Sequence, residues 1–192
     1  MRRVLLLLLA LPAFAYSQNL PYREMPPAPS EYNGHNVAAR LIDGMGFRYY
    51  WATEGLRPEN LAFKPTKESR TVLETAEHIH ELSVIILHSV QGVPNRMESP
   101  IEKMDYERLR RETLENLKSA ADLLRKSQDF QLQDYNMVFS RGKQKQTFNF
   151  FNEISGPVSD ALWHIGQVVT LRRQSGNPIT DKLNFLDGKL ME

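Results

Sequence analysis

Hydrophobic residues recur every three or four positions in four separate stretches of the chain, and this spacing predicts four amphipathic helices. We expect them over about residues 33–54, 71–91, 103–127 and 149–175. Four helices with one apolar stripe each predict an all-α fold, an up-down four-helix bundle with a long loop before the last helix. The stripes of the first three helices are Val37, Leu41, Met45, Tyr49 and Ala52; Val72, Ala76, Ile79, Ser83, Ile86 and Val90; and Tyr106, Leu109, Thr113, Leu117, Ala120 and Leu124.

The segments between these stretches lack helical spacing. Residues 57–70 contain two prolines and are expected to form a loop. In the long segment 129–148, apolar residues flank Arg141-Gly142-Lys143, which predicts a loose hairpin or an ordered loop. Within the last stretch, Pro157 predicts a helix start or a kink, because proline has no N–H to donate.

The first residues have the pattern of a secretory signal peptide. Two arginines precede a short apolar run that is too short to span a bilayer, and Ala13-Phe14-Ala15 provides small residues for cleavage before Tyr16. We therefore expect a signal peptide over residues 1–15 and an exported protein, periplasmic or secreted. A proline-rich arm over 16–32, one domain over 33–180 and a tail over 181–192 are expected to follow.

Composition excludes several kinds of function. Without the signal peptide the chain has 22 Lys and Arg against 23 Asp and Glu, a balance that argues against nucleic acid or an anionic membrane surface as the main partner. There is no cysteine, so no disulfide forms and no thiolate can act as nucleophile or metal ligand. A catalytic site would have to use His, Asp, Glu, Ser or Tyr.

Ionisable residues share one edge of the face that the last helix should bury. At about 100° per residue, Glu153, Asp160 and His164 fall within about 40° of one another. Charged residues are rarely buried without a partner. Asp160 and His164 are one turn apart, so both side chains can reach one metal ion. The same spacing also allows a buried hydrogen-bonded pair that only fixes the helix register, and the spacing does not decide between the two.

The second helix offers a further ligand. Of its three histidines, His78 is the one well placed to face a partner helix, at the margin of the buried arc, whereas His80 falls on the opposite side. Glu74 lies where it could accept a hydrogen bond from the second ring nitrogen of His78. With Asp160 and His164, His78 would form a set of two histidines and one carboxylate that leaves coordination positions open. Glu153 or Glu74 would then orient a ligand or act as a base.

Together these patterns resemble the DinB/YfiT-like superfamily of four-helix metalloenzymes. The resemblance rests on TVLETAEHIHEL, which contains His78, and on SDALWHIGQVVTLRRQSGNP, which is similar to the H-x-x-x-H-x-G-Q…LR…G pattern of the family. It covers most of the chain between Val37 and Pro178, including the first helix and the segment from Leu61 to Pro65.

The resemblance implies a divalent metal held by three histidines of that family. His78 and His164 match two of them, while the third position holds Asp160, which can ligate zinc, nickel, manganese or iron. Three functions are then open: a metal-dependent hydrolase of a small substrate, a small-thiol-dependent transferase on the same site, or a non-catalytic bundle that has lost the metal. Export is a poor setting for cytosolic thiol chemistry and favours the hydrolase. The resemblance also implies a possible homodimer.

Overall fold

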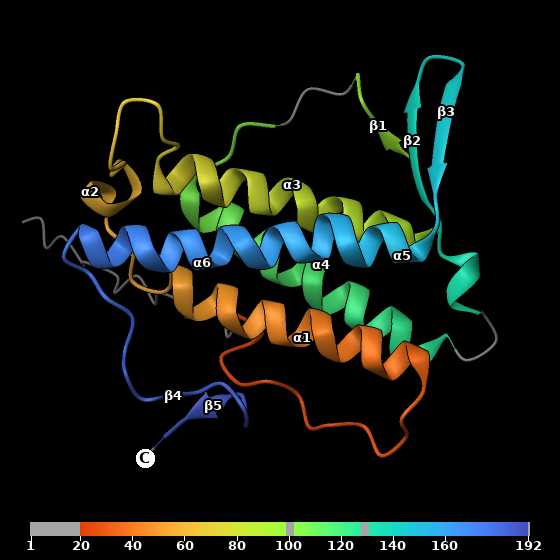
Figure 1. The fold of residues 1–192 in the computed structure, drawn as a ribbon, viewed down its shortest axis with the longest axis horizontal. Helices are drawn as coiled ribbons and strands as arrows, with labels where there is room; N and C mark the ends of the chain where they lie inside the picture. Colours follow the sequence, from red (N-terminus) through yellow and green to blue (C-terminus); the bar gives the residue numbers. More distant parts are fainter. Residues whose placement is uncertain (1–19, 99–101, 128–130, 192) are drawn as a thin grey trace, which may run out of the picture.

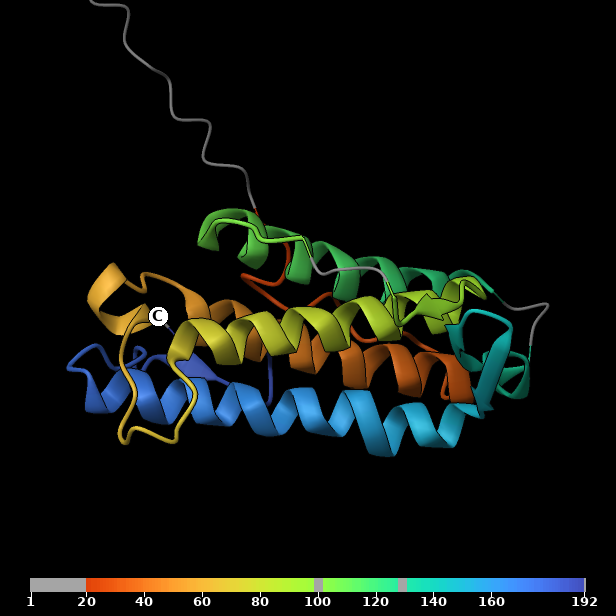
Figure 2. The same cartoon turned by 90° about the horizontal axis from the view of Figure 1, so that it is seen from above.

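Four long helices lie side by side in the computed structural model, which describes residues 20–98, 102–127 and 131–191 (Figure 1). These are α1 (Gly34–Thr53), α3 (Val72–Gln91), α4 (Tyr106–Lys126) and α6 (Ser159–Gln174). Helices α1 and α3 each pack against both α4 and α6 (Figure 2). The apolar stripes therefore meet in one core. The long helices predicted from the hydrophobic spacing are confirmed, with ends that differ by a few residues.

The order of helix directions differs from the predicted up-down arrangement. In Figure 1, α3 and α4 run in the same direction, and α1 and α6 run in the opposite one. The connection over residues 92–105 returns the chain to the start of α4. Its length permits this, because an extended segment of that size reaches about 45 Å, whereas a 20-residue helix is about 30 Å long.

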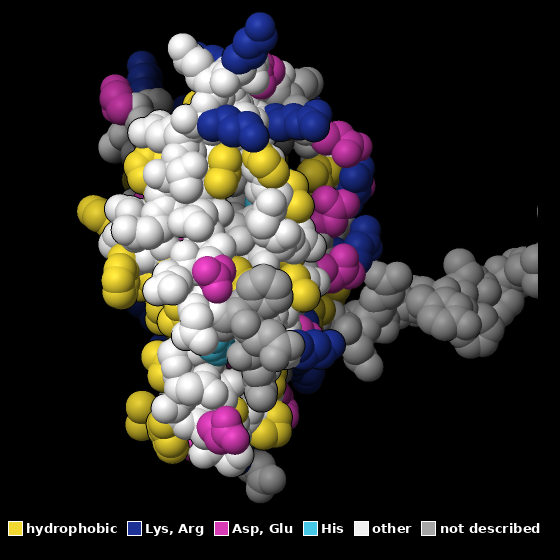
Figure 3. Space-filling model, turned by 90° about the vertical axis from the view of Figure 1, so that its right-hand side faces the viewer, with side chains coloured by type: hydrophobic (Ala, Val, Ile, Leu, Met, Phe, Trp, Pro, Cys, Tyr) yellow, Lys and Arg dark blue, Asp and Glu magenta, His cyan; other side chains and the backbone are white. Residues whose placement is uncertain are grey.

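The chain is not purely α-helical, which corrects the predicted fold class. Strands β2 (Met137–Arg141) and β3 (Gln144–Phe148) form the hairpin expected around Gly142, whose φ of 55° is in the left-handed region that suits a tight turn. The strand β1 (Asn95–Arg96) pairs with β2 in parallel. Figure 3 shows this end of the molecule, with Lys and Arg side chains at the top; Arg141, Lys143 and Lys145 are exposed.

The last helical stretch contains a widened turn. Helix α5 (Phe150–Glu153) continues through a π-helical turn, η2 (Ile154–Val158), into α6. Pro157 has no N–H for the carbonyl of Glu153, and the N–H and hydroxyl of Ser159 both donate to the carbonyl of Ile154 instead. The predicted irregularity at Pro157 is therefore confirmed as a π turn. Two short helices were not predicted: α2 (Pro58–Leu61) and the 3₁₀ turn η1 (Leu132–Asp134).

The segment before α1 packs on that helix and meets the C-terminal tail. The Tyr22 ring lies against Gly46 and its hydroxyl donates to Asp43, at 3.1 Å. In the tail, β4 (Leu183–Asn184) and β5 (Lys189–Leu190) form a second hairpin, and the N–H of Met25 donates to the carbonyl of Gly188. Val37, predicted to be buried, is 61% exposed, because α1 turns its alanines toward the core instead.

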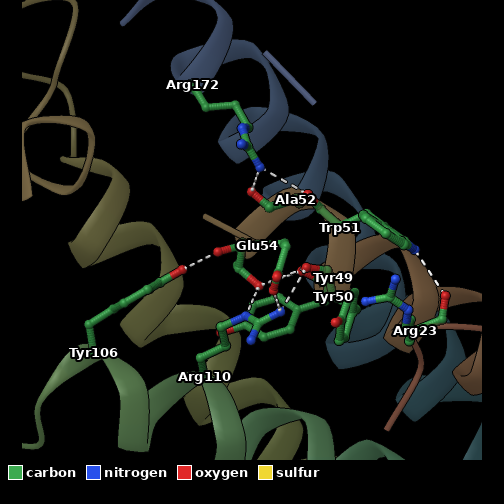
Figure 4. Close-up of polar contacts among 10 residues, drawn as sticks. Arg23, Tyr49, Tyr50, Trp51, Ala52, Glu54, Tyr106, Arg110 and Arg172 are labelled. Atoms are coloured by element: carbon green, nitrogen blue, oxygen red, sulfur yellow. Dashed lines mark hydrogen bonds and ion pairs between the residues drawn. The ribbon is translucent and has the colours of Figure 1, made fainter. Parts of the chain in front are cut away.

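Side chains from two other helices satisfy the last carbonyls of α1, which have no partner within the helix. Arg172 of α6 donates to the carbonyls of Trp51 and Ala52, each at 2.9 Å (Figure 4). Arg110 of α4 pairs with Glu54, and it also donates to groups in the last turn of α1. Both arginines are buried, so these contacts fix how α4 and α6 dock on α1.

Candidate metal centre

His78 of α3 and Asp160 and His164 of α6 come together at one place on the bundle. The Nε2 atom of His78 lies 3.2 Å from Oδ2 of Asp160, and the Nε2 atom of His164 lies 3.3 Å from Oδ1 of the same carboxylate. The two imidazole rings meet edge to face, with centroids 4.7 Å apart. One donor atom from each residue lies within 4.8 Å of the other two, so the predicted juxtaposition of the three residues is present.

The separations suit a small divalent ion. Two ligands that are each about 2.1 Å from a tetrahedral ion lie about 3.4 Å apart. The contacts of Asp160 with the two ring nitrogens are close to this value, and each uses a different oxygen of the carboxylate, so both oxygens face the place that an ion would occupy. The side chains are partly exposed, at 26% for His78, 15% for His164 and 42% for Asp160, so solvent reaches the cluster. Three protein ligands with solvent access leave room for water or substrate at an ion.

The contact between Gln167 and His164 favours a cation at the cluster. Its side-chain oxygen lies 2.7 Å from Nδ1 of His164, three residues earlier on α6. An amide oxygen only accepts, so Nδ1 carries the proton and a neutral ring presents a lone pair at Nε2. That lone pair faces the carboxylate of Asp160, which also only accepts. A second proton on the ring or a metal ion must stand between them.

Both ring nitrogens of His78 also face carboxylates. Its Nδ1 atom lies 3.5 Å from Oε2 of Glu81, and its Nε2 atom faces Asp160. The expected partner Glu74 is elsewhere: its carboxylate accepts from the N–H of Thr71, at 2.7 Å, in a capping box at the start of α3. The hydrogen bonds from Thr71 lower the pKa of Glu74. The Thr-x-x-Glu pattern that announces this cap is visible in the sequence.

Glu153 does not share the face of Asp160, contrary to the helical-wheel prediction. The π turn between them holds one more residue than an α-helical turn, which rotates Glu153 by about 100° relative to an unbroken helix. Its carboxyl group is fully buried, and burial raises its pKa to about 7. The Ser89 hydroxyl acts in the opposite direction, but neither oxygen of Glu153 has a hydrogen bond of ordinary geometry among the described residues.

The remaining histidines of α3 also have partners. His80, predicted to face away from the partner helices, is buried against α4, where its Nδ1 atom lies 3.1 Å from the Thr113 hydroxyl. The prediction failed because α3 packs on two helices and so buries two faces. Burial lowers the pKa of His80. His88 lies 2.8 Å from the side-chain oxygen of Asn95.

Sequence reasoning missed Gln167 and Glu81 as groups that contact the ligands. Each lies three residues after a cluster histidine, the spacing at which side chains on a helix meet, so the same spacing rule could have found both. Such contacts fix the tautomer and the ring orientation of metal-binding histidines.

Comparison with protein-family models, with curated proteins and with solved structures finds no match. The predicted signal peptide and its cleavage site lie outside the described residues. Among the described residues, no helix combines the length and apolar character needed to cross a membrane. The function must therefore be argued from the cluster itself.

Proposed function

We propose that this protein is a metal-dependent hydrolase of a small substrate, with one divalent ion held by His78, Asp160 and His164. The observation that carries the proposal is the arrangement of acceptors: a carboxylate placed between two imidazole nitrogens, with Gln167 holding the proton of His164 on the far side of its ring. A cluster of this kind favours a cation, and two histidines with one carboxylate form a common set of ligands for zinc and other divalent metals.

The residues around the cluster would prepare it for hydrolysis. A bound divalent ion would lower the pKa of a water to about 7 and polarise a substrate oxygen. Gln167 would keep Nε2 of His164 directed at the ion, and Glu81 would do the same for His78. The burial of Glu153 and the capping contact of Glu74 disfavour the earlier idea that either acts as the base.

We further propose a DinB/YfiT-like four-helix bundle as the scaffold, and export through the signal peptide over residues 1–15. The packing of four long helices around one core supports the scaffold, and the ligands lie on the second and last long helices, as the family pattern implies. The absence of cysteine is compatible with an exported protein that has no disulfides.

A non-catalytic bundle is the second candidate, and one observation favours it. Asp160 lies within hydrogen-bond distance of both imidazoles, so protonated histidines alone could bridge α3 and α6. In that case the cluster would only stabilise the packing of these helices.

Metal analysis separates the two candidates. The chain is purified without a histidine tag, offered zinc, nickel, manganese or iron, and dialysed. We expect about one ion per chain for the wild type and for the matched control His88→Ala, and less than about 0.1 for His164→Ala. The loaded wild type should also hydrolyse some members of a panel of activated esters and amides, and His164→Ala should not. If the wild type retains no ion, the hydrolase proposal is wrong and the non-catalytic bundle is the candidate that remains.

A further inference from the structure

A groove begins at the metal-site histidine of α6. It has a volume of about 720 Å³ and lies between α6 and the loop that precedes α3. His164 lines it, together with neighbouring residues of α6, Thr75 of α3 and part of the loop over 65–70. Its volume is in the range of small-molecule sites, about 300–1,000 Å³. A ligand in the groove would contact His164, the one residue of the cluster among the described residues that line it.

The groove extends from the cluster toward the N-terminal end of α3. The residues of α6 that line it run from Trp163 to Gln174, about 16 Å at 1.5 Å per residue. Thr75 lies one turn before His78 on α3, and Arg70 lies beyond Thr75, just before that helix begins. A ligand bound at the cluster can therefore extend along α6 toward Arg70.

Arg70 is the one formally charged residue among the described residues that line the groove when His164 is neutral. It is exposed, and no hydrogen bond or ion pair within 4 Å joins it to another described residue. Its charge lowers the pKa of Glu74, but the carboxylate of Glu74 accepts a hydrogen bond from Thr71 and forms no ion pair with Arg70. No carboxylate is among the described residues that line the groove, so with an ion at the cluster these walls carry positive charge near both ends.

We propose that the groove binds a small carboxylate substrate, with its carboxylate at Arg70 and its reactive group at the metal centre. The proposal rests on the proposed function and adds the substrate class. A guanidinium group recognises a carboxylate through two parallel hydrogen bonds. One arginine matches one negative charge, which favours a carboxylate over a doubly charged phosphate. The selected molecule is thus a monocarboxylate with a hydrolysable bond at some distance from the acid.

Hydroxamates test this inference, because the hydroxamate group chelates a divalent ion through two oxygens. The probes are adipic acid monohydroxamate, which ends in a carboxylate, and the hydroxamate of the same length that ends in a neutral amide. Calorimetry on the zinc-loaded wild type should show that the carboxylate probe binds about tenfold tighter or more. Arg70→Gln should remove that preference while leaving the affinity for the amide probe unchanged, and Arg70→Lys should keep part of it.

Lys67→Gln is the matched control, since Lys67 is an exposed cation of the same loop that does not line the groove. It should keep the full preference for the carboxylate probe. Equal binding of the two probes by the loaded wild type, or a preference that survives Arg70→Gln, would overturn the carboxylate assignment and leave the metal site standing. Tighter binding of a phosphonate-ended probe would overturn the choice of carboxylate. A chain that holds no zinc overturns both proposals.

Discussion

Replacing Glu153 by glutamine should remove a pH dependence from the stability of the fold. The Glu153 carboxyl is fully buried near the end of α5, and it lacks a hydrogen bond of ordinary geometry among the described residues. Burial raises its pKa from 4.5 to about 7, because a charge in an apolar surrounding loses its hydration. In the unfolded chain the same group ionises near its ordinary value.

The sign of the effect follows from which state binds the proton. Between pH 4.5 and about 7 the folded chain keeps the proton on Glu153 and the unfolded chain has lost it. The free energy of unfolding therefore falls as the pH rises through this window, and it is level above it. A difference of about 2.5 pKa units at 1.36 kcal/mol per unit makes the fall about 3 kcal/mol. Glutamine cannot ionise, so the variant should not show this fall in the free energy of unfolding.

Urea unfolding of the wild type and of Glu153→Gln at several pH values between 5 and 8 measures this effect. The variant should match the wild type within about 1 kcal/mol at pH 5 and exceed its stability by up to about 3 kcal/mol at pH 8. Taking the difference between the two proteins cancels other titrating groups, including His80, whose lowered pKa acts in the opposite direction. Glu115→Gln, at an exposed position of α4, is the control and should show no such trend.

A difference between the two proteins that stays constant within about 0.5 kcal/mol from pH 5 to pH 8 would refute the reasoning. It would mean that Glu153 ionises in the folded chain as easily as in the unfolded one, and so is not in an apolar environment.

Three further perturbations test other parts of the structure. Gly46→Ala should lower the free energy of unfolding by about 1–3 kcal/mol, since the added Cβ would clash with the Tyr22 ring. In a Tyr22→Ala background the same change should be neutral or stabilising. Arg110→Ala should cost about 1–3 kcal/mol in urea unfolding, because it removes the buried hydrogen bonds to Thr53 and Tyr50, while the Glu54 carboxylate that it leaves is 44% exposed and is solvated by water. Gln167→Ala should weaken zinc binding by about 10–100-fold in a competition titration, with an unchanged melting temperature for the metal-free chain, because His164 loses the contact that orients its ring.

Local spacing was sufficient to find the long helices and the cluster of His78, Asp160 and His164. Asp160 and His164 are four residues apart on one helix, so any α-helix places their side chains together. The position of His78 could be predicted because it lies at the edge of the apolar stripe of its own helix. The C-terminal end of α3 at Gly92 follows from residue type in the same way, since glycine adopts the left-handed conformation found there.

Features that depend on long-range packing could not be read from that spacing. The parallel course of α3 and α4 depends on where the connection over 92–105 leads, and loop length permits either direction. His80 is buried because α4 lies against a second face of α3, which a wheel with a single apolar face does not represent. Val37 is exposed for a different reason, because α1 turns Ala38 and Ala39 toward the core in its place.

The π turn before α6 changes which face of the continuous helix points toward the core, so the residues before and after the turn are not on the same face. Phe150 and Glu153 on its near side are packed into the core, while Asp160 and His164 beyond it remain accessible to solvent. Deleting Pro157 would remove both the extra residue and the missing N–H, restore an ordinary α-helix and swing α5 by about 100°. Phe150 would then leave the interior, and Glu153 would emerge beside Asp160 as an ordinary surface acid. Insertions and deletions at this joint should therefore be far less tolerated than amino-acid exchanges on the outer side of the same helix.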